Sequence, residues 1–458
     1  MKNLGKPAGT AGSRMDYPQT VAHLEARGMM PDRPPSLEPM HQALACMDLK
    51  LDPAQIILVA GTNGKGSISA TLETLLHSVG ERVGLYTSPH LIRATERIRL
   101  GGREITAYEF CEAYHAVMEG TRGLPPSTKL THFEMMTLMA VWTFATGAGG
   151  APMERMILEV GLGGTWDATN AIPHLTCIIA SLGLDHQNLL GNTLVEIASN
   201  KFGIVDPEPS VSVGNLEART RPHVPTQVIH APLPLETRAL AEFVRKKTDS
   251  QWTAVNPFPF HWRAGADGDP EFRLDTPWGE APLRLAGARG ALNTSVALQA
   301  FATLGYDPAR ALAALGQVVW PGRMESFRSS GKRVYLSGDH NAPGVQSLLE
   351  LLPAYPADRW HILVGIGKDK DADGVLGPLF AVPGAQVHLT ETPFRGRALS
   401  DYGVWGTRAA GLWPDPLEGL ATLIARAQPN DRILVTGSLY LVGAVKEWLE
   451  RQPPKESI

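Results

Sequence analysis

A glycine-rich turn between an apolar run and an amphipathic helix is the feature that most restricts how this chain can fold. The turn reads LVAGTNGKGSISA over residues 58–70. Residues 56–60 (IILVA) predict a buried strand, and apolar residues at helical spacing over 68–79 predict a helix that ends at Gly80. The run at 83–86 predicts the next strand. Such a strand–loop–helix–strand unit brings backbone N–H groups and a helix N-terminus to one point, which favours a bound phosphate.

The residues of this loop are therefore candidates for contacts to a nucleotide: Gly61, Thr62, Asn63, Gly64, Lys65, Gly66 and Ser67. Glycines allow a close backbone approach, Lys65 adds charge near the β and γ phosphates, and Ser67 can face a metal ion. The match to the P-loop pattern is imperfect, because Gly66 separates Lys65 from Ser67. A tight turn without a ligand is the simpler alternative, and the strand and helix on either side favour phosphate binding over it.

Short apolar runs alternate with amphipathic helices along the rest of the chain, which predicts an α/β fold with parallel strands covered on both faces. The further strand candidates are 155–160, 176–181, 333–337, 360–365, 386–390 and 432–436. A length of 458 residues favours two domains. We place them at 1–288, with a P-loop-type parallel sheet, and 289–458, a Rossmann-like α/β domain.

Two other regions bear on this division. Residues 205–290 are rich in Pro and Trp and predict irregular structure with antiparallel strands. The helical pattern then restarts with ALNTSVALQAFATLG, which Gly305 closes. The segment GIGKDKDADG from Gly365 begins like a dinucleotide fingerprint, but Lys370 occupies the third glycine position, so we do not expect a dinucleotide site.

The composition narrows the class of function. A formal net charge of −4 argues against general nucleic-acid or membrane binding. Three scattered cysteines predict neither a disulfide framework nor a zinc site. The chain has no apolar run long enough to span a membrane and no apolar signal core, so we expect a cytoplasmic protein with loose ends at 1–16 and 452–458.

Several motifs together carry a resemblance to a known family. GTNGKGS resembles the ATP loop of the Mur ligase superfamily, and TSPHLIRATERIRLGGREI (87–105) resembles the folate-handling segment of the folylpolyglutamate synthase/dihydrofolate synthase family. In that family's order follow THFEMMTLMAVWTFA (131–145), ILEVGLGGTWDATN (157–170), LGLDHQNLLG (182–191), WPGRMESF (320–327), GKDKD (367–371) and VTGSLYLVGAVKEWL (435–449). The resemblance covers residues 36–450.

A magnesium site is expected beside the loop, because ATP chemistry uses Mg²⁺ and this ion prefers hard oxygen ligands. Glu159 ends a predicted parallel strand, where side chains face the ligand crevice. The resemblance implies that Ser88, Glu159 and His186 hold Mg²⁺, and Asp185 is placed to orient the ring of His186. The simpler alternatives are a surface glutamate and a loop histidine bonded to backbone.

Lys201 is implied by the resemblance to be a carbamylated lysine that helps to hold a second metal. Taken alone, its position in IASNKFGIV predicts a solvated helix lysine. Asn200 stands where the family usually has glutamate, which weakens the inference.

The pteroate substrate is implied by the resemblance to contact Thr131, His132, Phe133, Glu134, Trp166, Asp167 and Ala168. Trp166 offers a flat face for stacking on an aromatic ring. Asp167 is a candidate acceptor for pterin N–H groups. The alternative for Phe133 is a place in a helix core, and Thr165 stands where the family often has arginine.

The second domain is implied to close over the nucleotide with Asn293 and Arg323. The family usually has an aspartate at the position of Ser337, and here an aspartate occurs two residues later, as Asp339. Since residues two apart on a strand share a face, we expect Asp339 to bind ATP or to order Arg323. A solvated loop residue is the alternative.

The predicted activity is therefore an ATP-dependent amide ligase. Phosphorylation of a carboxylate by ATP would give an acyl phosphate, which the amine of L-glutamate attacks. The expected partners are ATP, L-glutamate, and dihydropteroate or a reduced folate, bound by a monomer. The alternatives are a P-loop kinase or other NTPase, another Mur-type ligase, and a non-catalytic ATP- or folate-binding paralogue.

Overall fold

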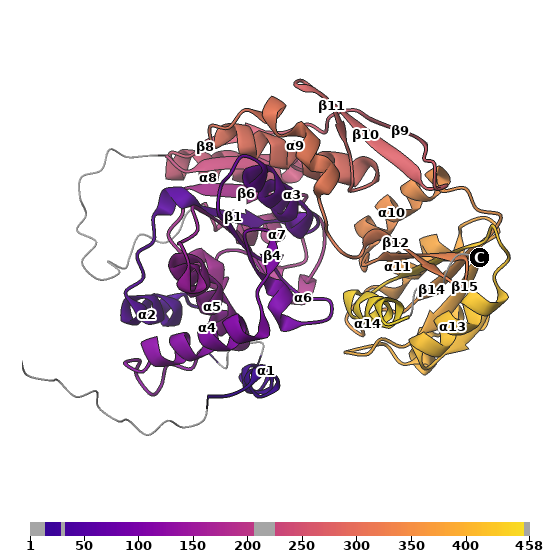
Figure 1. The fold of residues 1–458 in the computed structure, drawn as a ribbon, viewed down its shortest axis with the longest axis horizontal. Helices are drawn as coiled ribbons and strands as arrows, with labels where there is room; N and C mark the ends of the chain where they lie inside the picture. Colours follow the sequence, from indigo (N-terminus) through magenta and orange to yellow (C-terminus); the bar gives the residue numbers. More distant parts are fainter. Residues whose placement is uncertain (1–13, 29–32, 206–224, 453–458) are drawn as a thin grey trace, which may run out of the picture.

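The computed structural model describes residues 14–28, 33–205 and 225–452, which form two α/β lobes around two separate sheets (Figure 1). The α/β architecture predicted from the alternation of strands and helices is confirmed. Among the described residues, no helix is long and apolar enough to cross a membrane.

The first lobe contains an eight-stranded sheet in the order β4-β3-β2-β5-β1-β6-β7-β8. The strands are β1 Ile56–Ala60, β2 Val83–Tyr86, β3 Ile98–Leu100, β4 Arg103–Glu104, β5 Arg155–Glu159, β6 Thr176–Ile179, β7 Gln227–His230 and β8 Gln251–Ala254. The neighbours from β2 to β8 run parallel, whereas β3 and β4 form an antiparallel extension.

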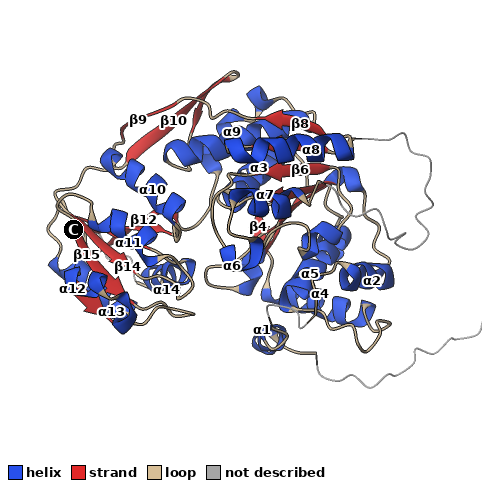
Figure 2. Ribbon diagram, turned by 180° about the vertical axis from the view of Figure 1, so that it is seen from behind, coloured by secondary structure: helices blue, strands red, loops and turns tan. Residues whose placement is uncertain are grey.

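Helices cover both faces of this sheet, as Figures 1 and 2 show from opposite sides. They are α1 Tyr17–Glu25, α2 Glu38–Met47, α3 Lys65–Ser78, α4 Ala107–Gly120, α5 His132–Thr146, α6 Gln187–Leu190, α7 Leu194–Phe202, α8 Arg238–Thr248 and α9 Gly287–Thr303. Successive side chains of β1 point to opposite faces of the sheet, which explains why helices pack on both faces. Ile57 and Val59 share a core with Leu72 of α3, while Leu58 packs on the opposite face with Leu138 of α5.

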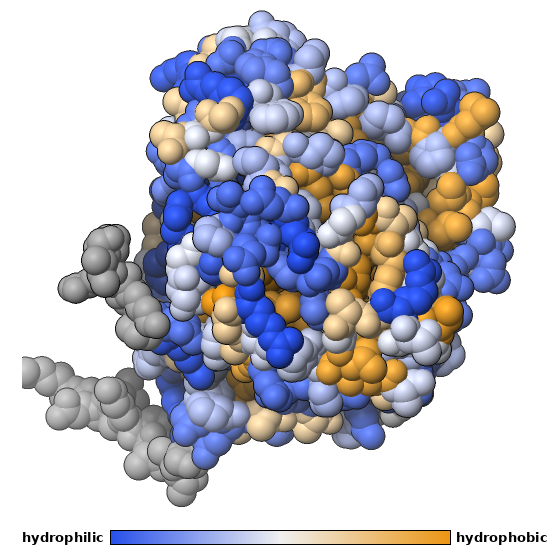
Figure 3. Space-filling view, turned by 90° about the vertical axis from the view of Figure 1, so that its right-hand side faces the viewer, coloured by the Kyte–Doolittle hydropathy of each residue, from blue (hydrophilic) through white to orange (hydrophobic). Residues whose placement is uncertain are grey.

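The second lobe contains a six-stranded sheet in the order β12-β13-β17-β14-β15-β16, parallel except for β12. Its strands are β12 Arg323–Ser329, β13 Lys332–Ser337, β14 Trp360–Val364, β15 Gln386–Thr390, β16 Gly411–Trp413 and β17 Arg432–Thr436. Its helices are α10 Ala342–Leu351, α11 Ala372–Phe380, α12 Val404–Arg408, α13 Pro416–Arg426 and α14 Leu439–Glu450. On the face shown in Figure 3, hydrophobic and hydrophilic residues are interspersed.

The region 205–290 differs in part from the prediction. Antiparallel strands are present, as β9 Phe260–Ala264, β10 Pro270–Thr276 and β11 Gly279–Pro282. The prediction of irregular structure is wrong from residue 225 on, because β7, α8 and β8 continue the parallel sheet. The predicted boundary at residue 288 lies at the start of α9, which packs against both α3 and α10, and it stays a prediction. The predicted loose ends lie largely outside the described residues.

Two buried histidines lie side by side in the second sheet. His361 on β14 and His388 on β15 have ring centroids 6.1 Å apart, and His361 Nε2 lies 3.0 Å from an oxygen of Asp431. Neither ring nitrogen of His388 has a hydrogen-bond partner among the described residues. Burial, together with the nearby His361 and Arg426, lowers the pKa of His388 to about 4. This imidazole is therefore neutral in the folded protein near pH 7.

Candidate active site

The glycine-rich loop joins β1 to the N-terminus of α3, as predicted. Gly61 and Gly64 have φ of 145° and 96°, values that residues with a side chain rarely adopt. The loop is anchored to the segment that follows β6, because the N–H groups of Thr62 and Asn63 donate to Ser181 O at 2.8 and 3.3 Å. Lys65 Nζ folds back over the loop and donates to Gly61 O at 3.2 Å.

The extra glycine after the lysine has a steric reason. A Cβ atom at Gly66 would lie 2.2 Å from a ring carbon of Trp320, which belongs to the segment leading into the second lobe. Any side chain at Gly66 would therefore push this tryptophan away from the loop. The departure from the P-loop pattern thus allows the second lobe to approach the phosphate loop.

The three predicted metal ligands come from the ends of neighbouring strands and one loop. Glu159 ends β5, Ser88 follows β2, and Glu159 Oε2 accepts a hydrogen bond from the backbone N of Ser88 at 3.1 Å. Glu159 is only 5% exposed, so the surface alternative is wrong. Burial raises the pKa of its carboxyl group against the opposing effect of Lys65. His186 caps α6 with a φ of 50°, and its ring lines the same cavity as Ser88 and Glu159.

Asp185 does not have the role predicted for it. Its Oδ1 accepts a hydrogen bond from the backbone N of His186 at 2.9 Å, so it fixes the backbone and not the imidazole ring. The carboxylate also contacts the second lobe, because Lys370 Nζ donates to Oδ1 at 3.0 Å and Asn341 Nδ2 to Oδ2 at 3.1 Å. Asn341 further exchanges two hydrogen bonds with Asn63 of the loop, at 3.2 and 3.3 Å. These polar contacts tie the phosphate loop to the second lobe.

Lys201 is buried, and the alternative of a solvated helix lysine is therefore wrong. Its Nζ donates to Gly61 O at 2.9 Å and so reaches the same loop as Lys65. Burial, and then the positive charge of Lys65, lower the pKa of Lys201 to about 7. The side chain of Asn200 makes a different contact, because its Nδ2 donates to Leu190 O at 3.2 Å.

Asp167 is not available as the predicted pterin acceptor. Its Oδ2 accepts from the backbone N–H groups of Gly161 and Leu162, both at 3.0 Å. Its Oδ1 accepts from the N–H and the hydroxyl of Thr169 at 3.0 and 2.6 Å. The prediction is wrong because this carboxylate already organises the turn that follows Glu159. Trp166 is 46% exposed, whereas Ala168 is buried.

The segment 131–134 begins α5. Thr131 is the N-cap, its hydroxyl accepts from Glu134 N at 3.2 Å, and Glu134 Oε2 accepts from Thr131 N at 2.8 Å. Glu134 also pairs with Arg33. Both ring nitrogens of His132 lack a partner among the described residues, and the ring of Phe133 lies against Gly161. A role for this segment in substrate binding stays a prediction.

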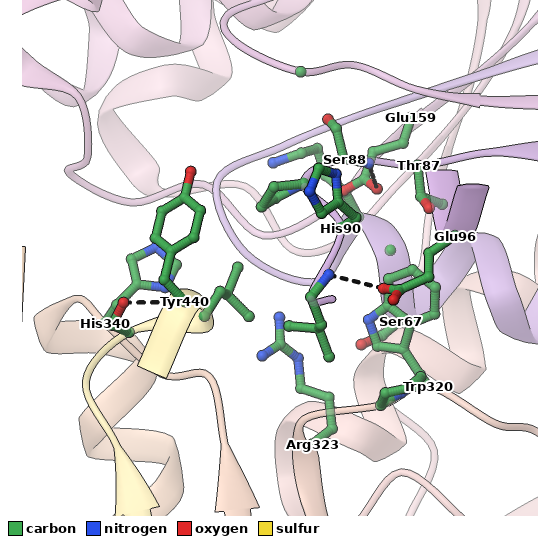
Figure 4. A pocket seen from close by; sticks show the side chains of 18 of the residues that line it. Ser67, Thr87, Ser88, His90, Glu96, Glu159, Trp320, Arg323, His340 and Tyr440 are labelled. Atoms are coloured by element: carbon green, nitrogen blue, oxygen red, sulfur yellow. Dashed lines mark hydrogen bonds between the residues drawn. The ribbon is translucent and has the colours of Figure 1, made fainter. Parts of the chain in front are cut away.

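The nucleotide residues predicted in the second half of the chain lie close to the loop. Asn293 on α9 places its Oδ1 against Gly64, where an added Cβ would lie 2.4 Å away. Arg323 opens β12 and lines the main cavity (Figure 4). Asp339 is 4% exposed, so the solvated alternative is wrong, and its carboxylate pairs with Arg289.

A cavity of about 710 Å³ lies between the two lobes. Ser88 and Glu159 face it from the first lobe, and Arg323, His340 and Tyr440 face it from the second (Figure 4). The predicted residues that line it are Gly61, Thr62, Asn63, Gly64, Lys65, Gly66, Ser67, Ser88, Glu159, His186, Lys201 and Arg323. The predicted residues 131–134 and 166–168, with Asn293 and Asp339, lie outside its lining.

Sequence reasoning missed an aromatic and basic group on the second-lobe wall. Phe394 and Tyr440 are 48% and 38% exposed, and their ring centroids lie 5.0 Å apart. The guanidinium of Arg395 lies 5.2 Å from the Phe394 centroid. The aromatic residues in FRGR and SLYL, next to the ends of parallel strands, were the available signal. Asn341 and Lys370 were not assigned a role from the sequence, although each also follows the end of a parallel strand.

Comparisons with known proteins agree with this geometry. Residues 322–439 match the family described as Mur ligase, glutamate ligase domain. The chain is 30% identical over 415 residues to the dihydrofolate synthase/folylpolyglutamate synthase of Escherichia coli (strain K12), covering 87% of this chain and 88% of the relative. It is 28% identical over 410 residues to the folylpolyglutamate synthase of Lacticaseibacillus casei, covering 86% and 89%.

Solved structures are similar over nearly the whole chain. A Mycobacterium tuberculosis folylpolyglutamate synthase complexed with ADP superposes with a TM-score of 0.80 at 25% identity, covering 95% of this chain and 99% of that one. Escherichia coli FolC in complex with DHPP and ADP gives a TM-score of 0.76 at 26% identity, covering 96% and 99%.

Proposed function

Because this chain belongs to the folylpolyglutamate synthase/dihydrofolate synthase family, we propose that it uses ATP to join L-glutamate to a folate and to dihydropteroate. The observation that carries this proposal is the cavity between the lobes. There the phosphate loop, the Ser88–Glu159–His186 group and Arg323 converge on one space. A P-loop kinase would share the loop but has no need of the glutamate ligase domain matched at residues 322–439.

ATP binding is explained by the residues at the N-terminus of α3. The loop glycines bring backbone N–H groups close to the phosphates, and the helix dipole favours negative charge at this end. Lys65, now bonded to Gly61 O, is within the loop and free to exchange this carbonyl for a phosphate oxygen. Arg323 approaches from the opposite wall with planar donors that suit a phosphate.

Magnesium fits the donor set of Ser88, Glu159 and His186. The three side chains line one cavity, and they offer a hydroxyl, a carboxylate and an imidazole. His186 bonds to Asp185 through its backbone N, and its side chain lines the cavity as a candidate ligand. When bound, Mg²⁺ neutralises charge on the phosphate oxygens.

Lys201 is proposed to carry the carbamate that the family resemblance implies. Its amine lies beside the loop at 2.9 Å from Gly61 O, and burial favours the neutral form that can react with CO₂. The product would replace a cation next to Lys65 with an anion that offers oxygen ligands.

The reaction proceeds by transfer of the γ-phosphoryl group to the substrate carboxylate, which gives an acyl phosphate and ADP. The amine of L-glutamate then attacks the acyl carbon, loses a proton, and phosphate leaves as the amide forms. The chain positions the reactants and balances charge. His340 and Lys370 lie on the second-lobe wall beside Asp185, and they are proposed to face the incoming glutamate. We propose a monomer as the active unit, because one chain supplies the phosphate loop, the Ser88–Glu159–His186 group and the opposite wall of the cavity.

The aromatic substrate is proposed to use the wall formed by Phe394, Arg395 and Tyr440. Exposed rings offer stacking surfaces for a pterin or benzoyl group, and Arg395 makes no ion pair with another described residue. The segments 131–134 and 166–168 remain proposed contacts of the pteroate, through Trp166 and the backbone.

The test uses purified protein with ATP, Mg²⁺, labelled L-glutamate and either dihydropteroate or a reduced folate. The proposal expects labelled folate product and ADP release that depends on both glutamate and the folate. ADP release without glutamate would indicate an NTPase or kinase, and ATP binding without turnover would indicate a non-catalytic paralogue. Turnover only with another acceptor would indicate a different Mur-type ligase.

Two variants make this test specific. Lys65→Met removes the charge from the loop, and Lys50→Met removes an exposed lysine whose side chain is 87% exposed. Loss of product with the first change and retention with the second assigns the activity to this site.

A further inference from the structure

The buried ion pair between Arg289 and Asp339 joins the two halves of the nucleotide site. Arg289 lies in the first turn of α9, and Asp339 follows the end of β13 in the second lobe. Arg289 Nη1 lies 2.5 Å from Asp339 Oδ1, and Ser337 Oγ donates to Asp339 Oδ2 at 2.7 Å. Each oxygen of this carboxylate therefore bonds to a side chain of the protein, and the ion pair gives Asp339 a role in holding Arg289.

Several N–H donors of Arg289 have no acceptor among the described residues. Only Nη1 bonds to a described residue, and its second acceptor is Gly344 O at 3.5 Å. Within the described chain, Nε and Nη2 make no hydrogen bond. A planar guanidinium has five N–H donors in a fixed fork, so holding one end at Asp339 fixes the direction of the others.

The surroundings of Arg289 are those of a nucleotide pocket. A small cavity of about 30 Å³ is lined by Arg289 together with Ser67 of the phosphate loop, Asn293 and Arg323. Asn293 lies one turn after Arg289 on the same helix face. Asn293 is 3% exposed, and its Oδ1 has no hydrogen-bond partner among the described residues. A buried polar atom without a partner is costly, which points to a ligand at this place.

The chemistry of the cavity distinguishes the two ends of ATP. The negative charge of Asp339 balances the positive charge of Arg289. Lys65 and Arg323 already provide cations for the phosphates. Leu285 and Met324 add apolar walls to the same cavity. The cavity holds only an edge of a ligand, and a guanidinium whose charge is already balanced suits a neutral acceptor, such as those of the ribose and purine, better than a phosphate oxygen.

We propose that Arg289 donates a hydrogen bond to the nucleoside half of ATP, and that Asp339 holds Arg289 in the required orientation. The inference rests on the proposed ATP-dependent function. It also gives a reason for the sequence at the end of β13. The family usually has an aspartate at position 337, whereas in this chain the negative charge lies at Asp339, where it holds the cationic side chain of Arg289. Arg289 is then a specificity-determining residue for the nucleotide.

The test measures the dissociation constants of ATP and of inorganic tripolyphosphate by calorimetry and by competition. For Arg289→Met we expect the ATP constant to rise about tenfold, the loss of one good hydrogen bond. The tripolyphosphate constant should stay within twofold, because the phosphate contacts are intact. Arg289→Lys keeps the positive charge opposite Asp339 but lacks the planar set of guanidinium donors. It should therefore weaken ATP binding while the unfolding temperature stays unchanged.

Two further variants complete the test. Arg284→Met removes an exposed arginine nearby and should change neither constant. Asp339→Asn should weaken ATP binding in the parent and have no further effect on it in Arg289→Met, because both changes remove one interaction.

Equal weakening of ATP and tripolyphosphate, or an ATP constant within twofold of the parent in both Arg289 variants, would overturn the inference. Failure of the parent to bind ATP would instead refute the proposed function itself.

Discussion

Replacing Asp167 with asparagine should destabilise the protein without a selective effect on substrate binding. The carboxylate accepts hydrogen bonds from Gly161 N, Leu162 N, Thr169 N and the Thr169 hydroxyl, at distances from 2.6 to 3.0 Å. In asparagine an NH₂ group replaces one of the two carboxylate oxygens. This group cannot accept hydrogen bonds from the two donors that face it. Two of the four bonds are then lost.

The magnitude follows from this count. A hydrogen bond to a charged acceptor contributes about 1.5–3 kcal/mol. Loss of two such bonds in a buried turn should therefore lower the free energy of unfolding by roughly 3 kcal/mol or more. That is a large part of the roughly 5–15 kcal/mol typical of a folded protein.

Urea unfolding followed by circular dichroism measures this effect, with the KM for dihydropteroate measured in parallel. Thr169→Val removes only the hydroxyl bond at 2.6 Å and should cost less than Asp167→Asn. Asp48→Asn, with a side chain 81% exposed, is the matched control and should leave the unfolding midpoint unchanged. A midpoint equal to the parent's in Asp167→Asn, with a raised KM for dihydropteroate, would refute the reasoning and restore the pterin-acceptor hypothesis.

Three further predictions concern charge. Lys65→Ala should lower kcat roughly 100-fold or more while circular dichroism stays unchanged, and activity within a few fold of the parent would contradict the phosphate-loop role. Glu159→Gln and His186→Ala should each raise the Mg²⁺ concentration needed for half-maximal activity or abolish turnover, and an unchanged Mg²⁺ dependence in both would show that they are not ligands. The folded-state pKa of His388 is about 4, against an ordinary 6.5, so the unfolded chain binds the extra proton between these values. Stability should therefore fall as the pH drops from 6.5 to 4, and less steeply in His388→Gln, as measured by urea unfolding at each pH.

The strands that form the centre of each sheet were predictable because they are short, apolar and buried on both faces. β1, β5, β14 and β17 read as near-continuous runs in the sequence. The strand β12 (RMESFRS) was missed because it has polar residues on both faces and none that is fully buried, and an edge strand needs no continuous apolar run. β3 and β4 are too short to produce a periodic signal.

The site residues divide in the same way. Glu159 and the loop of Lys65 were predictable because the ends of parallel strands converge on one crevice. Asp167 and Asp339 carry the same carboxylate chemistry, but their roles depend on partners that the sequence pattern does not reveal. Asp339 pairs with Arg289, fifty residues earlier in the chain and on a helix of the other lobe. Only the folded structure brings such residues together.

Isotope transfer from the substrate carboxylate tests the ligase mechanism most directly. Dihydropteroate labelled with ¹⁸O in its carboxylate is incubated with the protein, ATP, Mg²⁺ and L-glutamate, and the released phosphate is analysed by mass spectrometry. An acyl phosphate forms through a carboxylate oxygen, which leaves with the phosphate when the amine attacks. The account predicts one ¹⁸O atom in each phosphate released with dihydrofolate. Amide formation with unlabelled phosphate, or phosphate release without amide, would contradict it.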